Sequence, residues 1–540
     1  MLVPTITNIT VVVQLFAYST IWIYNSVWRE KFKMYDVILL TDVTDTIPVY
    51  KTIGAHKLAY ELRKRGYSCL VVDRLHSFSI DELIKLMDCV IGSKTLLVGI
   101  STTFLQNSNI QKDDSKPIVF TPLSNDTFLP QGKDAETYMV SYIKKLNQQT
   151  QIVVGGTKAH SNYTNKNADY AILGYAESSI INLADHLSLG SVLTNTIKNV
   201  WGVKVIDDRT AALYDFRHSK MSWEKLDVVN YKILPFEVAR GCIFKCKFCS
   251  YPMNGKKNLD FIRSTENMMF ELEKNFYEHG VDTYTILDDT FNDNLPKLKM
   301  LLDAVKKLKF QPKFWAYTRL DLMAKHPETM SMLYDIGIRG VQFGIETLNR
   351  KTGKIIGKGL SKKKQIETVQ YLRNKFENKI SLHGTFIVGL PEENEDSVRQ
   401  TFDTVMSQDM PLHSWRWFPL GISKKDKVPW SSDISLNFKE YGYREVTNNP
   451  DSILINWEND FMDYTKAVRL ATEFNTLSEQ SPNFFIPNIL GWGLLELGFT
   501  MDQITSTNYK DLNWASLSKS KAEFDNNYKQ QLFSLLGIAS

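Results

Sequence analysis

The most constraining feature of this 540-residue chain is a CxxxCxxC motif formed by Cys242, Cys246 and Cys249. This spacing gathers three thiolates on one short loop and leaves a fourth ligand position unfilled. A structural zinc site normally closes its tetrahedron with four protein ligands, and the other two cysteines, Cys69 and Cys89, lie far upstream. An iron–sulfur cluster held by cysteine thiolates therefore suits the three residues better than zinc.

The cysteine loop is also compatible with two simpler arrangements. A distant histidine could complete a zinc site, or the three thiols could lie without a ligand near the surface. A disulfide framework is disfavoured, because five cysteines in 540 residues is a low and odd number. Such cysteine usage is typical of a reducing compartment, so we expect a cytoplasmic protein.

Composition indicates ordinary globular protein, with 43% hydrophobic and 23% charged residues and a length that suits two or three domains. The 64 basic and 60 acidic residues give a net charge of +4, so no global field favours nucleic acid as a partner. Residues 351–364 are locally basic. We interpret this stretch as a solvated loop and the start of a helix.

Residues 1–33 form an apolar extension that has two interpretations. The stretch 9–28 carries no charge, is long enough to cross a bilayer and is followed by basic residues that would keep the remainder in the cytoplasm. Membrane association is expected only through this stretch. We favour the second interpretation, in which the working protein does not need the extension, because polar residues interrupt it and the first convincing strand follows Met34 directly.

Residues 34–210 alternate short apolar runs with amphipathic stretches, which predicts βαβ units around a parallel sheet. Gly155, Gly156 and Gly174 come just past predicted strand ends, where open α/β sheets place their ligand crevice. The pattern therefore predicts a doubly wound, Rossmann-type domain. The expected strands are 35–40, 69–72, 96–100, 151–154 and 170–173, and the expected helices are 53–64, 135–146 and 178–187.

Residues 211–420 repeat a strand–helix unit six times, which predicts a partial (β/α)6 barrel of the TIM type. The carboxyl ends of strands in such a barrel converge on one mouth, so polar residues at these ends point into a shared pocket. The cysteine loop, Asp288, Arg319 and Glu346 all follow predicted strands. The expected strands are 236–239, 283–287, 313–317, 340–345, 382–388 and 414–418.

The cysteine loop resembles that of the radical S-adenosylmethionine (radical SAM) superfamily, in which an aromatic residue, here Phe248, precedes the last cysteine. The resemblance implies a 4Fe–4S cluster whose free iron chelates SAM, and the three cysteines would be its ligands. Gly344 to Glu346 is similar to the family's fourth strand end, which implies that Glu346 contacts SAM. Ile387 to Gly389 is similar to the fifth and would border the adenine, although the first glycine of that motif is displaced to Gly384.

Asp288, Asp289 and Arg319 stand at other strand ends, where they would contact SAM or substrate. The alternatives are that the two aspartates cap the following helix and that Arg319 simply pairs with Asp321.

The first domain resembles the cobalamin-binding-like domain that precedes many radical SAM barrels. A strand ending in VVGG, at Gly155 and Gly156, and a strand followed by GxxE, at Gly174 and Glu177, occur in the family's order. The DxHxxG motif, whose histidine replaces the lower axial base of cobalamin, is absent from the sequence. The resemblance thus implies the fold and leaves bound cobalamin as an open expectation.

Residues 421–540 are rich in aromatic residues, with apolar spacing that predicts a mainly helical cap or substrate region. The expected function is a radical SAM enzyme that cleaves SAM reductively, with cobalamin-dependent methyl transfer as one outcome. The alternative is an iron–sulfur electron-transfer or sensor protein that does not cleave SAM. Expected partners are a small-molecule or peptide substrate of unknown identity and an electron donor such as a flavodoxin or ferredoxin.

Overall fold

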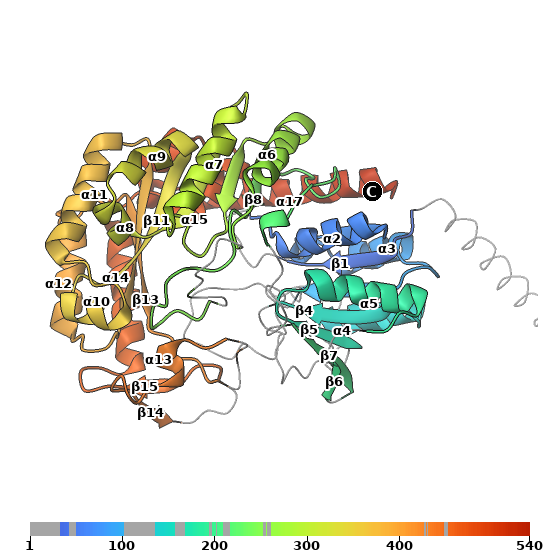
Figure 1. Cartoon of the computed structure of the whole chain (residues 1–540), viewed down its shortest axis with the longest axis horizontal. Helices are drawn as coiled ribbons and strands as arrows, with labels where there is room; N and C mark the ends of the chain where they lie inside the picture. Colours follow the sequence, from blue (N-terminus) through green and yellow to red (C-terminus); the bar gives the residue numbers. More distant parts are fainter. Residues whose placement is uncertain are drawn as a thin grey trace, which may run out of the picture.

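A computed structural model of the chain describes residues 33–42, 50–101, 135–156, 168–193, 197–200, 202–208, 216–251, 255, 261–425, 428, 430–447 and 452–539. The apolar stretch 9–28 lies outside these residues. Within the described ranges, no helix combines the length and the apolar character needed to span a bilayer. Two parallel sheets organise the chain, with one on each side of Figure 1.

The first sheet has seven strands in the order β2-β1-β3-β4-β5-β7-β6. Neighbouring strands are parallel, except that β6 runs antiparallel to β7. Four-residue apolar runs such as that of β1 are buried along their whole length, as strands covered on both faces must be. The strands are β1 (Val37–Leu40), β2 (Cys69–Val72), β3 (Leu97–Ser101), β4 (Gln151–Gly155), β5 (Tyr170–Leu173), β6 (Ile197–Val200) and β7 (Val203–Asp207).

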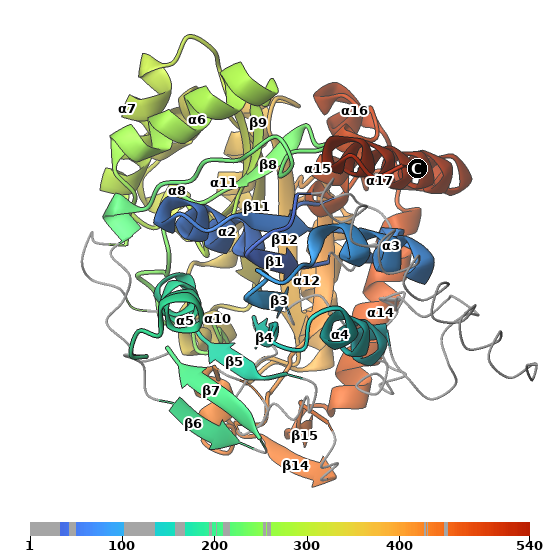
Figure 2. The ribbon, with the colours of Figure 1, turned by 90° about the vertical axis from the view of Figure 1, so that its right-hand side faces the viewer.

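Helices cover both faces of this sheet. Helices α2 (Gly54–Arg65) and α5 (Glu177–Leu189) pack their apolar residues on one face, and α3 (Ile80–Val90) and α4 (Ala135–Leu146) pack theirs on the other (Figure 2). The domain is doubly wound, as the sequence predicts. The edge hairpin of β6 and β7 and the helix α3, which begins with a capping box at Ser79, were not among the expected elements.

The second sheet has six parallel strands in the order β13-β12-β11-β10-β9-β8, which is their order along the chain reversed. The end strands β8 and β13 do not pair with each other, so the barrel is partial, as predicted. The strands are β8 (Ile233–Phe236), β9 (Thr283–Ile286), β10 (Lys313–Thr318), β11 (Ile338–Glu346), β12 (Ser381–Val388) and β13 (Ser414–Pro419). The first of them ends three residues before the predicted end, because the chain turns after Phe236 toward the cysteine loop.

Helices follow the barrel strands and bury their apolar faces against the sheet in one large core. They are α6 (Thr265–His279), α7 (Leu295–Lys307), α8 (Leu320–Lys325), α9 (Glu328–Ile336), α10 (Arg350–Ile356), α11 (Lys362–Phe376) and α12 (Glu395–Met406).

The C-terminal region is mainly helical, as predicted, but its parts cover different surfaces. Helix α14 (Tyr464–Gln480) packs on β13, α15 (Asn488–Glu496) packs on β11 and β12, and the long helix α17 (Trp514–Leu536) packs on the N-terminal domain (Figure 1). Arg74, two residues after the end of β2, forms an ion pair with Asp525 of α17 at 2.5 Å. The elements are α13 (Asp433–Leu436), β14 (Arg444–Thr447), β15 (Asn456–Glu458), α14 (Tyr464–Gln480), α15 (Asn488–Glu496), α16 (Met501–Ser506) and α17 (Trp514–Leu536).

Candidate active site at the mouth of the barrel

The cysteine loop leaves β8 at the carboxyl edge of the second sheet, and Asp288 holds its first turn. Asp288 Oδ1 accepts hydrogen bonds from the backbone N–H groups of Val238 and Ala239 at 2.8 and 2.9 Å. The same carboxylate forms a buried ion pair with Lys297 of α7 at 3.2 Å. The alternative that Asp288 caps the following helix is wrong, because Asn294 caps α7.

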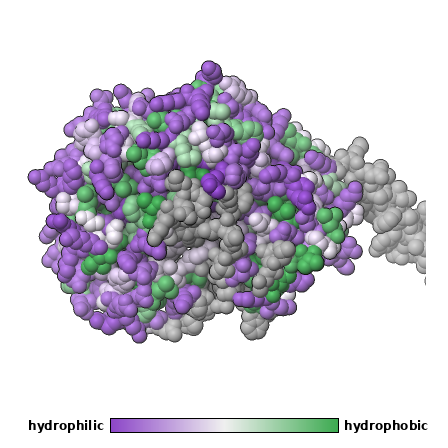
Figure 3. Space-filling view, viewed as in Figure 1, coloured by the Kyte–Doolittle hydropathy of each residue, from purple (hydrophilic) through white to green (hydrophobic). Residues whose placement is uncertain are grey.

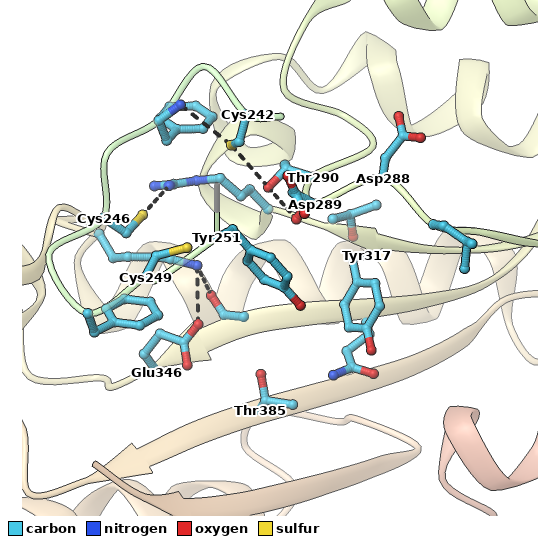
Figure 4. Close-up of a pocket in the computed structure, with 18 residues that line it drawn as sticks. Cys242, Cys246, Cys249, Tyr251, Asp288, Asp289, Thr290, Tyr317, Glu346 and Thr385 are labelled. Atoms are coloured by element: carbon cyan, nitrogen blue, oxygen red, sulfur yellow. Dashed lines mark hydrogen bonds and ion pairs between the residues drawn. The ribbon is translucent and has the colours of Figure 1, made fainter. Parts of the chain in front are cut away.

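The three motif cysteines line one cavity of about 250 Å³ together with residues from the ends of β9 to β12 (Figure 4). Cys242 is buried, which raises the pKa of its thiol, and its Sγ lies 3.5 Å from Thr290 Oγ1. Cys246 and Cys249 are half-buried, and Phe248 beside them lines the same cavity.

The donor set of this cavity fits a cluster better than a single ion. No three His, Cys, Asp or Glu side chains among the described residues converge closely enough to hold one metal ion. The described lining also contains no histidine that would complete a zinc tetrahedron. A 4Fe–4S cluster spreads its cysteine ligands over separate irons, so three thiols around one cavity are the arrangement it requires.

Arg319 follows β10 and contacts the cysteine loop. Its Nη1 donates to Cys246 Sγ at 3.1 Å, and its guanidinium lies 3.9 Å from the ring centre of Phe244. It also pairs with Asp321 at 2.6 Å, as one alternative predicts. The pair and the contact with the cysteine thus coexist, and the pairing orients the guanidinium toward the cysteine loop.

Glu346 is the last residue of β11 and faces the cavity. Its backbone adopts φ +68°, a left-handed conformation that is strained for a non-glycine residue. Burial raises the pKa of its carboxyl, and Lys358 opposes this effect through an ion pair at 3.3 Å. Lys358 Nζ also donates to the carbonyl of Gly344 at 2.5 Å, so a single lysine fixes the strand end.

Asp289 is the carboxylate of the cavity that has no ion pair and no side-chain hydrogen bond within the described residues. Burial, together with the neighbouring charge of Asp288, raises the pKa of Asp289 to about 7. A cationic ligand beside Asp289 would favour the ionised form of this carboxyl and would itself be bound by the negative charge.

Several residues of the cavity were not predicted from the sequence. Tyr251 lines the cavity from the cysteine loop, and Tyr317, Gln342 and Thr385 line it from β10, β11 and β12 (Figure 4). The available signal was the two-residue alternation of these strands, because every second side chain faces the same side.

The two residues predicted at the fifth strand end, Ile387 and Gly389, lie in different surroundings. Ile387 lines an adjoining cavity of about 260 Å³ that shares Phe248, Gln342, Glu346 and Thr385 with the first. Gly389 lines neither cavity. It has φ +93°, its carbonyl accepts from the Tyr443 hydroxyl at 2.7 Å, and an added Cβ would lie 2.4 Å from the Trp457 ring.

The carboxyl edge of the first sheet meets the cysteine loop through Arg240. Its Nη1 pairs with Glu177 at 2.5 Å, its Nε pairs with Glu237 at 2.9 Å, and its guanidinium lies 4.7 Å from the ring centre of Tyr175. Gly155 and Gly156 end β4 at this same edge, and Gly156 has φ +104°. The predicted crevice and the cysteine loop are therefore neighbours.

The histidines near this edge have their ring nitrogens engaged. His56 bonds Asp227 at 3.0 Å and Asp73 at 3.3 Å, and His76 bonds Asp42 at 2.5 Å and lies 3.4 Å from Lys521 Nζ. His160, also present in the sequence of this domain, lies outside the described residues.

Known proteins resemble this chain both in sequence and in fold. The model of the Radical SAM superfamily matches residues 236–405, from β8 to α12. The chain carries a radical SAM domain. An uncharacterized methyltransferase of Pyrococcus horikoshii is 25% identical over 298 residues, 51% of this chain and 62% of that protein. Bacteriochlorophyllide d C-12(1)-methyltransferase of Chlorobaculum tepidum is 25% identical over 188 residues, 34% of this chain and 40% of that protein.

The chain spans about half the length of the curated relatives it matches. Among solved structures, the radical SAM methyltransferase TsrM from Kitasatospora setae, with cobalamin and a [4Fe-4S] cluster bound, superposes with a TM-score of 0.62 at 14% identity. That match covers 92% of this chain and 100% of TsrM. The cobalamin-dependent radical enzyme OxsB gives a TM-score of 0.52 at 16% identity, over 75% of this chain and 56% of OxsB. The predicted radical SAM barrel and preceding cobalamin-binding-like fold are confirmed as folds.

Proposed function

We propose that this protein is a cobalamin-dependent radical SAM methyltransferase that holds a 4Fe–4S cluster on Cys242, Cys246 and Cys249 and binds SAM beside it. One observation carries the proposal. Three thiols, a free carboxylate and a guanidinium surround a single cavity at the mouth of a parallel barrel, and the ligand edge of a doubly wound domain adjoins the same loop. Cys242, Cys246 and Cys249 would hold the cluster, which would supply the electron for reductive cleavage of SAM.

The residues around the cysteines have separate tasks in this proposal. Arg319 donates to Cys246 Sγ, so it neutralises part of the thiolate charge and keeps that thiolate in place. Asp288 fixes the first turn of the loop through two backbone N–H groups. Neither residue needs to react, because their role is to hold the ligands in position before SAM arrives.

Two charged groups suit the ends of the methionine part of SAM. Asp289 is unpaired among the described residues and would accept hydrogen bonds from the SAM amino group. Arg319 has the charge to attract the SAM carboxylate. Glu346, Thr385 and Ile387 line the opposite wall, where the adenosine part would lie.

The assignment of cobalamin rests on the fold and on the neighbouring edges. TsrM and OxsB are described with cobalamin bound and share the fold of both domains. In this chain, Arg240 ties Glu177, the first residue of α5, to Glu237, which lies five residues before the first motif cysteine. Gly155 and Gly156 would border bound cobalamin at this edge, and the cofactor would supply the methyl group that is transferred to the substrate. The substrate in this proposal is a small molecule or a peptide.

The alternative is an iron–sulfur electron carrier or sensor. It predicts the cluster but no product from SAM, so one experiment separates the two. Protein reconstituted without oxygen should contain about four irons per chain and bind cobalamin. With dithionite, it should convert SAM to deoxyadenosine and methionine.

Cys246→Ala should lower the iron content and abolish deoxyadenosine formation. Cys89→Ala, which removes a thiol from the core of the N-terminal domain, is the matched control and should retain both. Deoxyadenosine formation that survives in the Cys246 variant would refute the proposal, whereas a stable cluster with no SAM cleavage would favour the electron carrier. Cobalt absent after reconstitution with cobalamin would refute the cobalamin part alone.

A further inference from the structure

A basic segment without any acidic residue runs from the end of β11 to the start of α11. Between Glu346 and Glu367 the chain carries seven basic residues and no aspartate or glutamate. Most of them are exposed at α10, the turn after it and the first turn of α11. The seven residues, here called the basic segment, are Arg350, Lys351, Lys354, Lys358, Lys362, Lys363 and Lys364.

The turn of the basic segment packs directly on the cysteine loop. Lys247 donates its backbone N–H to the carbonyl of Ile356 at 3.1 Å, and Arg319 Nη2 donates to the carbonyl of Gly357 at 3.1 Å. A Cβ on Gly357 would lie 3.7 Å from Cys246 Cα, although Gly357 is itself exposed. Solvent and a cluster ligand are thus separated here by a single layer of backbone.

Nearby carboxylates neutralise the segment only in part. Lys358 points inward to Glu346, and Lys351 pairs with Glu392 at 2.7 Å on the surface. Lys363 and Lys364 share Glu367 at 3.9 and 3.8 Å. Such exposed ion pairs contribute little to the stability of the fold, and salt screens the attraction between their charges.

Three cations of the segment have no carboxylate partner among the described residues. Arg350, Lys354 and Lys362 are exposed and form no ion pair within the described part of the chain. Hydrophilic residues predominate on the side of the molecule where α10, α11 and α12 lie (Figure 3).

We propose that the basic segment is the docking surface for a small acidic electron-carrier protein of the flavodoxin type, which reduces the cluster through the backbone at Gly357. This inference rests on the proposed function, because it needs the cluster on the cysteines. In each transfer the reduced carrier loses one electron and the cluster gains it, and no proton or bond changes. An acidic protein is favoured over nucleic acid because the positive charge concentrates where the cysteine loop approaches the surface, and opposite charges speed the encounter of transient redox partners.

Binding can be tested before any cluster is loaded. Oxidised acidic flavodoxin should bind the protein as purified, with an affinity that falls as salt rises. The double variant Lys354→Glu/Lys362→Glu should weaken binding by about tenfold or more. The control Lys306→Glu/Lys519→Glu changes the net charge equally at exposed lysines of α7 and α17 and should bind like the parent.

Reduction kinetics then separate this proposal from the function on which it rests. With reduced flavodoxin, the reconstituted double variant should reduce its cluster about tenfold more slowly than the parent, and with dithionite at the same rate. Unchanged reduction by flavodoxin would overturn the docking surface, as would equal slowing with both reductants or by the control variant. Tight binding of a short DNA or RNA duplex in place of flavodoxin would also overturn it. Failure of dithionite to support SAM cleavage would instead refute the proposed function.

Discussion

Arg319 donates a hydrogen bond from Nη1 to the Sγ of Cys246 over 3.1 Å, while the Asp321 carboxylate holds the other side of the guanidinium at 2.6 Å. The arrangement places a fixed cation beside one ligand of the proposed cluster. Hydrogen bonds and positive charge near a cluster thiolate stabilise the reduced state, which carries one more electron.

Arg319→Met should therefore lower the midpoint potential of the reconstituted cluster. We expect a shift of about 60 mV, which corresponds to a tenfold change in a one-electron equilibrium. A redox titration followed by electron paramagnetic resonance measures it. Arg339→Met is the control, because its guanidinium donates hydrogen bonds to backbone carbonyls away from the cavity. This variant should leave the midpoint potential unchanged. Equal potentials in the parent and the Arg319 variant would show that this contact does not tune the cluster.

The ion pair of Arg240 with Glu177 should couple the two domains energetically. Both side chains are largely buried, so removal of either one leaves the other without this ion pair, whereas removal of both leaves only Glu237, the second partner of Arg240, without its cation. Arg240→Met and Glu177→Gln should each lower the free energy of unfolding by about 2–4 kcal/mol. The double variant should lose about 1–3 kcal/mol less than the sum of the single variants. Urea denaturation of the four proteins measures this, and purely additive losses would argue against the coupling.

Gly389→Ala should destabilise the protein by about 3 kcal/mol or more. The added methyl would meet the Trp457 ring at 2.4 Å, and alanine would also have to adopt φ +93°. Gly498 has the same φ of +93° with nothing within 4 Å of its position. Gly498→Ala thus reports the backbone cost alone, about 1 kcal/mol. Similar losses in the two variants, by thermal denaturation, would exclude the clash with Trp457.

Glu393 should make stability depend on pH. Burial raises the pKa of its carboxyl from 4.5 to about 8, and its hydrogen bond from Thr347 at 2.6 Å opposes this only in part. Between these two values the unfolded chain has lost this proton and the folded chain keeps it, so stability falls as pH rises. Relative to Glu393→Gln, the parent should lose about 1.4 kcal/mol per pH unit between about pH 4.5 and 8 and then level off. Urea denaturation across this range measures the difference, and a difference independent of pH would contradict the prediction.

Most of the architecture could be predicted from the sequence because local patterns carry it. Buried runs such as Cys69–Val72 and Tyr170–Leu173 coincide with the observed strands β2 and β5. Apolar residues at helical spacing placed α4 at residues 135–146 as observed. The predicted end of the first barrel strand differs from the observed end at Phe236. The chain turns there into the cysteine loop, whose backbone bonds to Asp288, and local propensity does not indicate such a distant partner.

The sequence predicted some residues of the candidate site and not the roles of others. The spacing of Cys242, Cys246 and Cys249 by itself places three thiols on one loop, and the chain order of the strands brings Arg319 and Glu346 to the same edge. The sequence could not separate Asp288, which holds the loop, from Asp289, which faces the cavity unpaired among the described residues. Adjacent residues at a strand end differ only in orientation, which the neighbouring backbone decides.

Only the tertiary structure decided contacts between segments far apart in the chain. Gly389 packs against Trp457, Arg74 pairs with Asp525 of α17, and the basic turn at Gly357 lies on Cys246. The sequence alone determined the cysteine loop, the two parallel sheets and the order of the polar strand ends, because each depends on residues a few positions apart. Side-chain direction and long-range packing depend on the whole core, so no local pattern could determine them.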